Sequence, residues 1–221
     1  MHKIGEFWIP DIDAAPGRNR RGSRIDLGER QAVLTSQLEH ALDLVPGREL
    51  AIDGGANVGA WSRVMGDYFD CVHSFEPNPA AYECLVRNIA EWDLDDVVTT
   101  HPRGISDRHE FVSIGTKDGA RTVTGRITGK GPIECVTIDS LDLAVCSFLK
   151  LDVEGYEAQA LTGARETIRR HRPWIMVENR PSRWNLLRRP SRAERILREL
   201  GYVLVEKFGD DHLDWLFRPS A

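Results

Sequence analysis

One short stretch, in which a strand, a glycine turn and a helix follow one another, constrains the fold most. The apolar run Leu50–Asp53 leads into Gly54 and Gly55, and an amphipathic run begins at Ala60, as in a strand, a tight turn and a helix start. Gly55 and Gly59 would let the backbone turn sharply and approach a ligand, while free N–H groups at the helix start favour polar or anionic ligand atoms. The stretch therefore predicts a nucleotide-binding turn.

A second acidic residue strengthens this prediction. Glu76 ends the next apolar run, Cys71–Phe75, about one βαβ unit after the glycine turn. In a parallel sheet, a carboxylate at the tip of the neighbouring strand can accept both hydroxyls of a ribose. The turn departs from the dinucleotide pattern G-x-G-x-x-G because Asn57 replaces the second glycine. A tight connection without a ligand is the alternative for the turn alone, and Glu76 weighs against it.

The length of 221 residues suits one α/β domain with a short appendage. We expect an N-terminal arm or lid over residues 1–28 and a single domain over residues 29–221. The net charge of −5 argues against a general nucleic-acid binder. Neither a signal peptide nor a membrane-spanning run is present in the sequence, so we expect a cytoplasmic protein without a membrane partner. The four cysteines lack any C-x-x-C pair and are expected to be reduced core thiols.

Helical and strand patterns alternate along the rest of the chain. Helices are expected at 29–45, 60–69, 79–89, 157–171 and 191–200, central strands at 50–53, 72–76, 97–100, 147–152, 174–178, 202–208 and 213–217, and short antiparallel strands at 111–114, 123–127 and 135–138. Asn78 is the expected N-cap of the third helix, with Pro79 in its first position. So short a link as Gly209–His212 requires a hairpin, which makes the last strand antiparallel in an otherwise parallel sheet. Such a hairpin is the signature of S-adenosylmethionine (SAM) methyltransferases, whereas a nicotinamide dehydrogenase would continue with another βα unit or a substrate domain.

Several motifs, in order and spacing, resemble the FkbM family of SAM-dependent methyltransferases over roughly residues 50–180. They are Ile52–Gly59, Phe75–Pro79, Ile105–Asp107, Thr137–Leu141, Phe148–Glu157, Leu161–Ala164 and the strand ending at Glu178. The resemblance implies a Rossmann-like class I methyltransferase fold, a three-layer αβα sandwich with a mostly parallel seven-stranded sheet and an antiparallel C-terminal strand. It also implies transfer of the SAM methyl group to a hydroxyl of a sugar or natural product.

The resemblance implies a set of cofactor-binding residues as well. The methionine part of SAM would be lined by the glycine turn, the ribose held by Glu76, and the adenine bordered by the segment after the third strand. The full expected set is Asp53, Gly54, Gly55, Asn57, Gly59, Glu76, Pro77, Ile105, Ser106 and Asp107.

Acidic residues at two other strand ends are the candidates for catalysis. A hydroxyl is a poor nucleophile at neutral pH and needs a general base or a cation to remove its proton. We expect Asp152 and Glu178 to form the polar pair at the reaction centre, with Glu154 as the next candidate. One of them acts as base, or Asp152, Glu178 and Asn179 hold Mg²⁺ through oxygen ligands. The alternative role of Glu154 and Glu157 is to cap the helix that begins near Glu157.

The identity of the acceptor does not follow from the two arginine clusters or from the histidines. The clusters are Arg18, Arg20, Arg21 and Arg24, and Arg180, Arg183, Arg188, Arg189, Arg192 and Arg195. A solvated helix face with a basic loop is favoured; alternatively, both clusters receive a phosphorylated or nucleic-acid substrate, with Trp8 or Trp184 stacking on a sugar or base. No histidine stands in a motif: the expected places are the core or rim (His73), the loop beside the crevice (His101, His109) and the hairpin turn (His212).

The sequence thus predicts an O-methyltransferase acting on a small, sugar-like hydroxyl acceptor. A nucleic-acid or nucleotide methyltransferase and a SAM-binding module without catalysis are the alternatives. A NAD-dependent oxidoreductase is disfavoured by Asn57 and the terminal hairpin. Acceptor choice is expected to lie in residues 1–28 and 180–195, because loops of this kind carry specificity while the sheet carries the cofactor.

Overall fold

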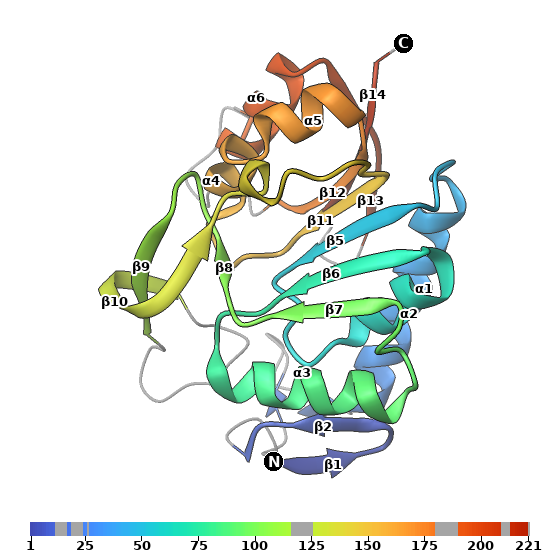
Figure 1. The fold of residues 1–221 in the computed structure, drawn as a ribbon. Helices are drawn as coiled ribbons and strands as arrows, with labels where there is room; N and C mark the ends of the chain where they lie inside the picture. The colour runs from blue at the N-terminus through green and yellow to red at the C-terminus, as the bar shows by residue number, and fades with distance from the viewer. Residues whose placement is uncertain are drawn as a thin grey trace.

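A seven-stranded sheet forms the centre of the protein in a computed structural model, which describes residues 1–11, 17–18, 24–25, 27–115, 126–179, 190–208 and 213–220. The strand order is β13-β14-β12-β11-β5-β6-β7 (Figure 1). The strands are β5 (Leu50–Gly54), β6 (Cys71–Phe75), β7 (Val98–His101), β11 (Phe148–Leu151), β12 (Trp174–Glu178), β13 (Tyr202–Phe208) and β14 (Asp214–Pro219). Strand β14 runs antiparallel to both β12 and β13, as the short final connection predicted.

The first strand, β5, lies in the middle of the sheet and pairs in parallel with β6 and β11. Asp53 on β5 is the Cα partner of Ser74 on β6 and of Lys150 on β11. Because these strands are parallel, their carboxyl ends meet at one edge, where ligands bind in open α/β sheets. This register brings the glycine turn, Glu76 and Asp152 to the same edge.

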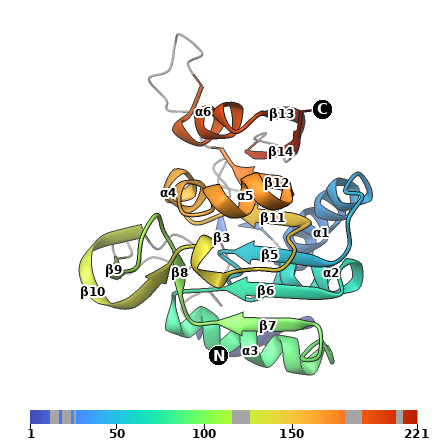
Figure 2. The same ribbon diagram turned by 45° about the horizontal axis from the view of Figure 1, so that its top comes forward.

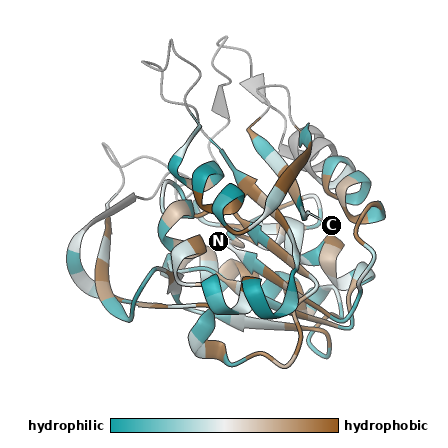
Figure 3. Ribbon diagram, turned by 90° about the horizontal axis from the view of Figure 1, so that it is seen from above, coloured by the Kyte–Doolittle hydropathy of each residue, from teal (hydrophilic) through white to brown (hydrophobic). Residues whose placement is uncertain are grey.

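Helices cover both faces of the sheet, which confirms the three-layer Rossmann-like fold (Figure 2). One face packs against α1 (Leu27–Asp43), α2 (Ala60–Tyr68) and α3 (Pro79–Glu91), and the other against α4 (Glu157–Thr162), α5 (Arg165–His171) and α6 (Arg192–Glu199). Hydrophobic segments run through the central strands, whereas hydrophilic and hydrophobic residues alternate along the helices (Figure 3). The predicted cap of α3 is present, since Asn78 accepts from the N–H of Ala80 at 3.0 Å.

The helix expected over residues 157–171 is instead two helices, α4 and α5. The break lies at Gly163, where a Cβ would stand 2.2 Å from the backbone oxygen of Ser106. Asp139 then caps α5 by accepting from the N–H and the hydroxyl of Thr167, both at 2.8 Å. Long-range contacts that periodicity does not encode therefore interrupt the helix.

A separate three-stranded sheet follows β7, with β10 between β8 and β9. Its strands are β8 (Gly104–Ile105), β9 (Glu110–Gly115) and β10 (Arg126–Val136). We expected two strands, at 123–127 and 135–138, separated by a glycine-rich turn, and this was wrong for the described part. β10 is one strand that passes through Gly129 and Gly131, with register shifts on either side of Gly129. The glycines thus mark irregular pairing within a strand.

The first residues form a hairpin of β1 (His2–Ile4) and β2 (Phe7–Ile9), which docks on α3. Further along, β3 (Gly17–Arg18) and β4 (Arg24–Ile25) also pair antiparallel. All four cysteines are free thiols, as expected. In the part of the chain that the structure describes, no helix combines the length and hydropathy needed to cross a membrane.

Candidate functional site

The glycine turn is held tightly between two neighbouring strands. The N–H groups of Gly55 and Ala56 both donate to the carbonyl of Phe75 on β6, at 3.0 and 2.9 Å. Gly55 has φ 80°, and a Cβ there would stand 1.9 Å from the backbone oxygen of Asp152. A side chain at this position is therefore excluded by backbone conformation and by contact with the end of β11.

Glu76 lies at the tip of β6 and faces this turn. The residue is only 8% exposed, and its two carboxylate oxygens accept from the N–H groups of Asn57 and Asn78, each at 2.8 Å. Burial raises the pKa of Glu76 to about 7, although both hydrogen bonds and the positive charge of Lys150 oppose the increase. Pro77 lies directly between Glu76 and the N-cap of α3.

The segment expected to border adenine comes close to the same strand end. Ile105 is 2% exposed, and its Cδ1 lies 3.0 Å from where a Cβ of Gly54 would be. The fully buried Ser106 donates from its hydroxyl to Glu110 at 2.6 Å. Asp107 is the partly exposed member of the segment.

Asp53, expected to line the methionine part of SAM, is fully buried beneath the turn. Its carboxylate accepts from the hydroxyl of Ser62 at 2.7 Å and lies 3.0 Å from the ammonium of Lys150. This buried lysine was not predicted from the sequence. In the sequence, Lys150 could have been noticed as the single charged residue inside an apolar strand. That strand directly neighbours the strand that ends near Asp53.

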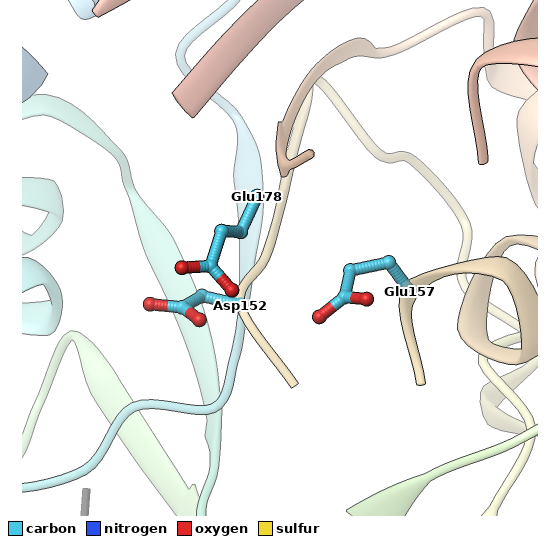
Figure 4. Close-up of side chains that lie close together, drawn as sticks. All are labelled: Asp152, Glu157 and Glu178. Carbon is cyan, nitrogen blue, oxygen red and sulfur yellow. The ribbon is translucent and has the colours of Figure 1, made fainter. Parts of the chain in front are cut away.

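Three carboxylates converge beside the glycine turn (Figure 4). Oxygen atoms of Asp152, Glu157 and Glu178 all lie within 4.8 Å of one another. Asp152 follows β11, Glu178 ends β12 and Glu157 begins α4. The structure therefore brings together the expected pair, Asp152 and Glu178, and adds a carboxylate that had been interpreted only as a helix cap.

Glu157 lies in the first turn of α4, which has no side-chain cap within the described ranges, and its Oε1 accepts from the N–H of Gly155, just before the helix, at 2.9 Å. Burial raises its pKa, and the neighbouring charge of Asp152 adds to the increase. Glu154 is not a member of the carboxylate group among the described residues; it occupies the turn before α4 with φ 52°. Asn179 is buried next to Glu178, and its N–H donates to Leu213 at 2.7 Å.

Among the described residues, no histidine belongs to the carboxylate group. His73 and His101 contact each other through ring nitrogens 2.9 Å apart, and burial lowers the pKa of His101 to about 4, with the charges of His73 and Arg103 adding to the decrease. His109 is hydrogen-bonded to Glu134 at 2.9 Å. His212 lies outside the described residues.

Most of the arginine clusters also lie outside the described residues, namely Arg20, Arg21, Arg180, Arg183, Arg188 and Arg189, together with Trp184. Of the remainder, Arg18 and Arg24 are Cα partners across β3 and β4, and Arg192 and Arg195 belong to α6. Trp8 is engaged within the protein, since the guanidinium of Arg87 lies 3.4 Å from the centre of its ring.

Comparisons with known proteins identify a methyltransferase family. The family profile described as the methyltransferase FkbM domain matches residues 53–204, which is more than half of the chain. A search of curated proteins found no significant match.

Two solved structures with a similar fold are described as methyltransferases. A methyltransferase FkbM from Methylobacillus flagellatus KT is 20% identical with a TM-score of 0.53, and the match covers 79% of this chain and 44% of that one. This chain thus spans less than half the length of that protein. A SAM-dependent methyltransferase from Leishmania major is 11% identical with a TM-score of 0.50, over 87% of this chain and 73% of that one. At these identities the likeness establishes the fold.

Proposed function

Because the chain belongs to the FkbM family of methyltransferases, we propose that it transfers a methyl group from SAM to a hydroxyl oxygen of a sugar-like acceptor. The observation that carries the cofactor assignment is the buried carboxylate of Glu76 beside the glycine turn. Each of its oxygens accepts one backbone N–H and keeps a further lone pair. The carboxylate at the tip of β6 can therefore accept hydrogen bonds from two ribose hydroxyls.

The reaction requires an acceptor held in line with the methyl group, and a destination for the hydroxyl proton. SAM, when bound, supplies a methyl carbon on a positively charged sulfur; the S–CH₃ bond breaks as the new C–O bond forms, and the sulfur is left as a neutral thioether. We assign the proton to the pair Asp152 and Glu178, whose carboxylates project beside the turn (Figure 4). Glu157 lies close to both, and its charge favours proton uptake by the pair.

The same three carboxylates offer an alternative way to activate the hydroxyl. Oxygen atoms within 4.8 Å of one another are the type of ligand that Mg²⁺ prefers. Asp152, Glu157 and Glu178 would then be the ligands, a bound cation would supply a lower pKa for the acceptor hydroxyl, and Asp152 would not act as a base. Dialysis against EDTA separates the two cases, because general-base catalysis by the carboxylates survives removal of divalent cations.

Two variants test the proposal by calorimetric titration with SAM and by methyl transfer to a panel of sugars. Glu76→Gln is expected to weaken SAM binding at least about tenfold, because an amide supplies one acceptor oxygen instead of two. Asp152→Asn is expected to retain SAM binding and to lose methyl transfer by about 10²-fold or more. Glu83→Gln and Asp95→Asn, at exposed positions, are the matched controls.

Either of two results would count against this function. If the unaltered protein does not bind SAM, the cofactor assignment is wrong. If it binds SAM and Asp152→Asn methylates the acceptor at the original rate, the protein is a methyltransferase whose catalytic residues lie elsewhere. We assign residues 29–221 to a single catalytic domain. Acceptor choice is assigned to residues 1–28, which precede it, and to residues 180–195 within it.

A further inference from the structure

A buried ion pair lies directly under the glycine turn. The ammonium of Lys150 on β11 is 3.0 Å from the carboxylate of Asp53 on β5, and their side chains are 4% and 0% exposed. Desolvation of two charges is costly, and it is offset only where geometry and additional hydrogen bonds are good. The negative charges of Asp53, Asp152 and Asp214 favour the ammonium of Lys150 and oppose the cost of its burial.

Lys150 also binds the turn itself. Its ammonium donates to the backbone carbonyl of Gly55 at 3.1 Å and lies 4.9 Å from the centre of the Trp61 ring on α2, within the range of a cation–π contact. One side chain from β11 therefore contacts the end of β5, the turn that follows and the first part of α2.

The pair continues into a hydrogen-bonded chain that reaches β6. Ser74 on β6 donates to the hydroxyl of Ser62 at 2.9 Å, and Ser62 donates to Asp53 at 2.7 Å. All three side chains are fully buried. Strands β11, β5 and β6, whose tips carry Asp152, the glycine turn and Glu76, are thus joined by one polar network.

We propose that Lys150 is a positioning residue for the cofactor site, which fixes the glycine turn through the carbonyl of Gly55 and supplies the positive charge that opposes the carboxylates at the strand ends. The proposal rests on the assignment of SAM as cofactor, since its consequence for function is the orientation of the turn and the ionisation of Glu76. The motif in which Lys150 stands thus serves the cofactor as well as carrying Asp152.

The two members of the ion pair act on Glu76 with opposite sign. The charge of Lys150 lowers the pKa of Glu76, and the charge of Asp53 raises it. The carboxylate accepts hydrogen bonds from the N–H groups of Asn57 and Asn78, which are neutral. Removing one charge at a time should therefore move the titration of Glu76 in opposite directions, which loss of packing alone would not do.

The experiment is a carboxyl ¹³C NMR titration without SAM, in which the Glu76 signal is identified by its absence in Glu76→Gln. Lys150→Met is expected to raise the titration midpoint by about one pH unit, and Asp53→Asn to lower it by about as much. The double variant should return towards the midpoint near 7. Lys130→Met, at an exposed position on β10, should leave it unchanged.

A titration with SAM at several pH values gives the functional readout. A rise of one pH unit in the midpoint leaves about one-eleventh of Glu76 ionised at pH 7 instead of half, so Lys150→Met should bind SAM at least roughly fivefold more weakly there. If Lys150→Met does not fold, the comparison of the double variant with Asp53→Asn isolates the charge of Lys150 in the same way.

Equal midpoints in Lys150→Met and the unaltered protein, or shifts of the same sign in both single variants, would overturn the role of Lys150. Failure of the unaltered protein to bind SAM would overturn the proposed function. The NMR titration is made without SAM, so the two failures are distinguishable.

Discussion

At the scale of single residues, the proposed cofactor site depends on the ionisation of Glu76. Its pKa is raised to about 7, mainly by burial, whereas an exposed glutamate titrates near 4.3. The ionised carboxylate has the acceptors that two ribose hydroxyls need, and the protonated form has lost one of them to its own O–H. If SAM binds as proposed, its binding is therefore coupled to proton release in the neutral pH range.

The first prediction concerns this coupling. SAM affinity should be nearly constant above pH 8 and should fall about tenfold per pH unit below 7, because a proton must leave Glu76 before SAM binds. Calorimetry in buffers of different ionisation enthalpy should detect release of about half a proton at pH 7. Glu76→Gln should remove both the pH dependence and the proton release; affinity independent of pH between 6 and 8 would contradict the role of Glu76.

Residue identities at strand ends were predictable from the sequence, whereas their partners were not. Asp152 and Glu178 are acidic residues that directly follow or end apolar strands, and parallel strands bring such positions together. Glu157 was missed because its place in the first turn of a helix already explained a carboxylate. Lys150 was missed because period-two patterning treats an isolated charge in a buried strand as an exception and does not say which carboxylate it meets.

At the scale of elements, the caps and breaks of helices connect the motifs to one another. Asp139 lies in the short helix Asp139–Leu141 before β11, and its carboxylate caps α5 by accepting from Glu166 and Thr167. The N–H of Asp139 in turn donates to the carbonyl of Gly163 at 2.9 Å. The motifs Thr137–Leu141 and Leu161–Ala164, to which no role was assigned from the sequence, are thus hydrogen-bonded to each other. They lie beside the segment that follows β8.

We predict that Asp139→Ala lowers the free energy of unfolding by about 1–2 kcal/mol, because N–H groups at the start of α5 and the Thr167 hydroxyl lose their acceptor. Urea denaturation followed by circular dichroism measures the change. Asp95→Ala, at an exposed turn position, should alter stability by less than about 0.5 kcal/mol. A loss no larger in Asp139→Ala than in this control would show that the cap is not needed.

The positions of helices and strands were predicted well from periodicity and caps. The predictions were wrong where segments distant in the sequence contact each other. Asn78 and Pro79 located the start of α3, and the alternation of βα units located the parallel strands. The break between α4 and α5 depends on the approach of Gly163 to Ser106, a contact between residues far apart in the sequence. β10 was divided in error because glycine residues indicate turns more often than irregular pairing within a strand.

At the scale of the whole molecule, one buried amide links the N-terminal hairpin to the glycine turn. Asn88 on α3 accepts from the N–H of Trp8 at 2.7 Å and donates to its carbonyl at 2.9 Å. The same amide nitrogen donates to the carbonyl of Val58 at 2.8 Å, and Ile9 packs against Val58 and Cys84. The sequence suggested only an arm here, because an aromatic patch without periodicity does not identify the helix on which it docks.

Removal of residues 1–11 should therefore affect the cofactor site as well as stability. The deletion exposes the apolar contacts of Val58 and Cys84 and leaves Asn88 with one protein partner instead of two, so we expect a lower melting temperature by several degrees and roughly threefold to tenfold weaker SAM binding. Differential scanning calorimetry and titration with SAM measure the two effects. Lys3→Ala removes the exposed ion pair with Glu91 and the contact of Lys3 with the Trp8 ring. It should change neither quantity by much, because exposed pairs contribute little. If the deletion lowered the melting temperature and left SAM affinity intact, the hairpin would stabilise α3 without supporting the turn, and the link through Val58 would carry no function.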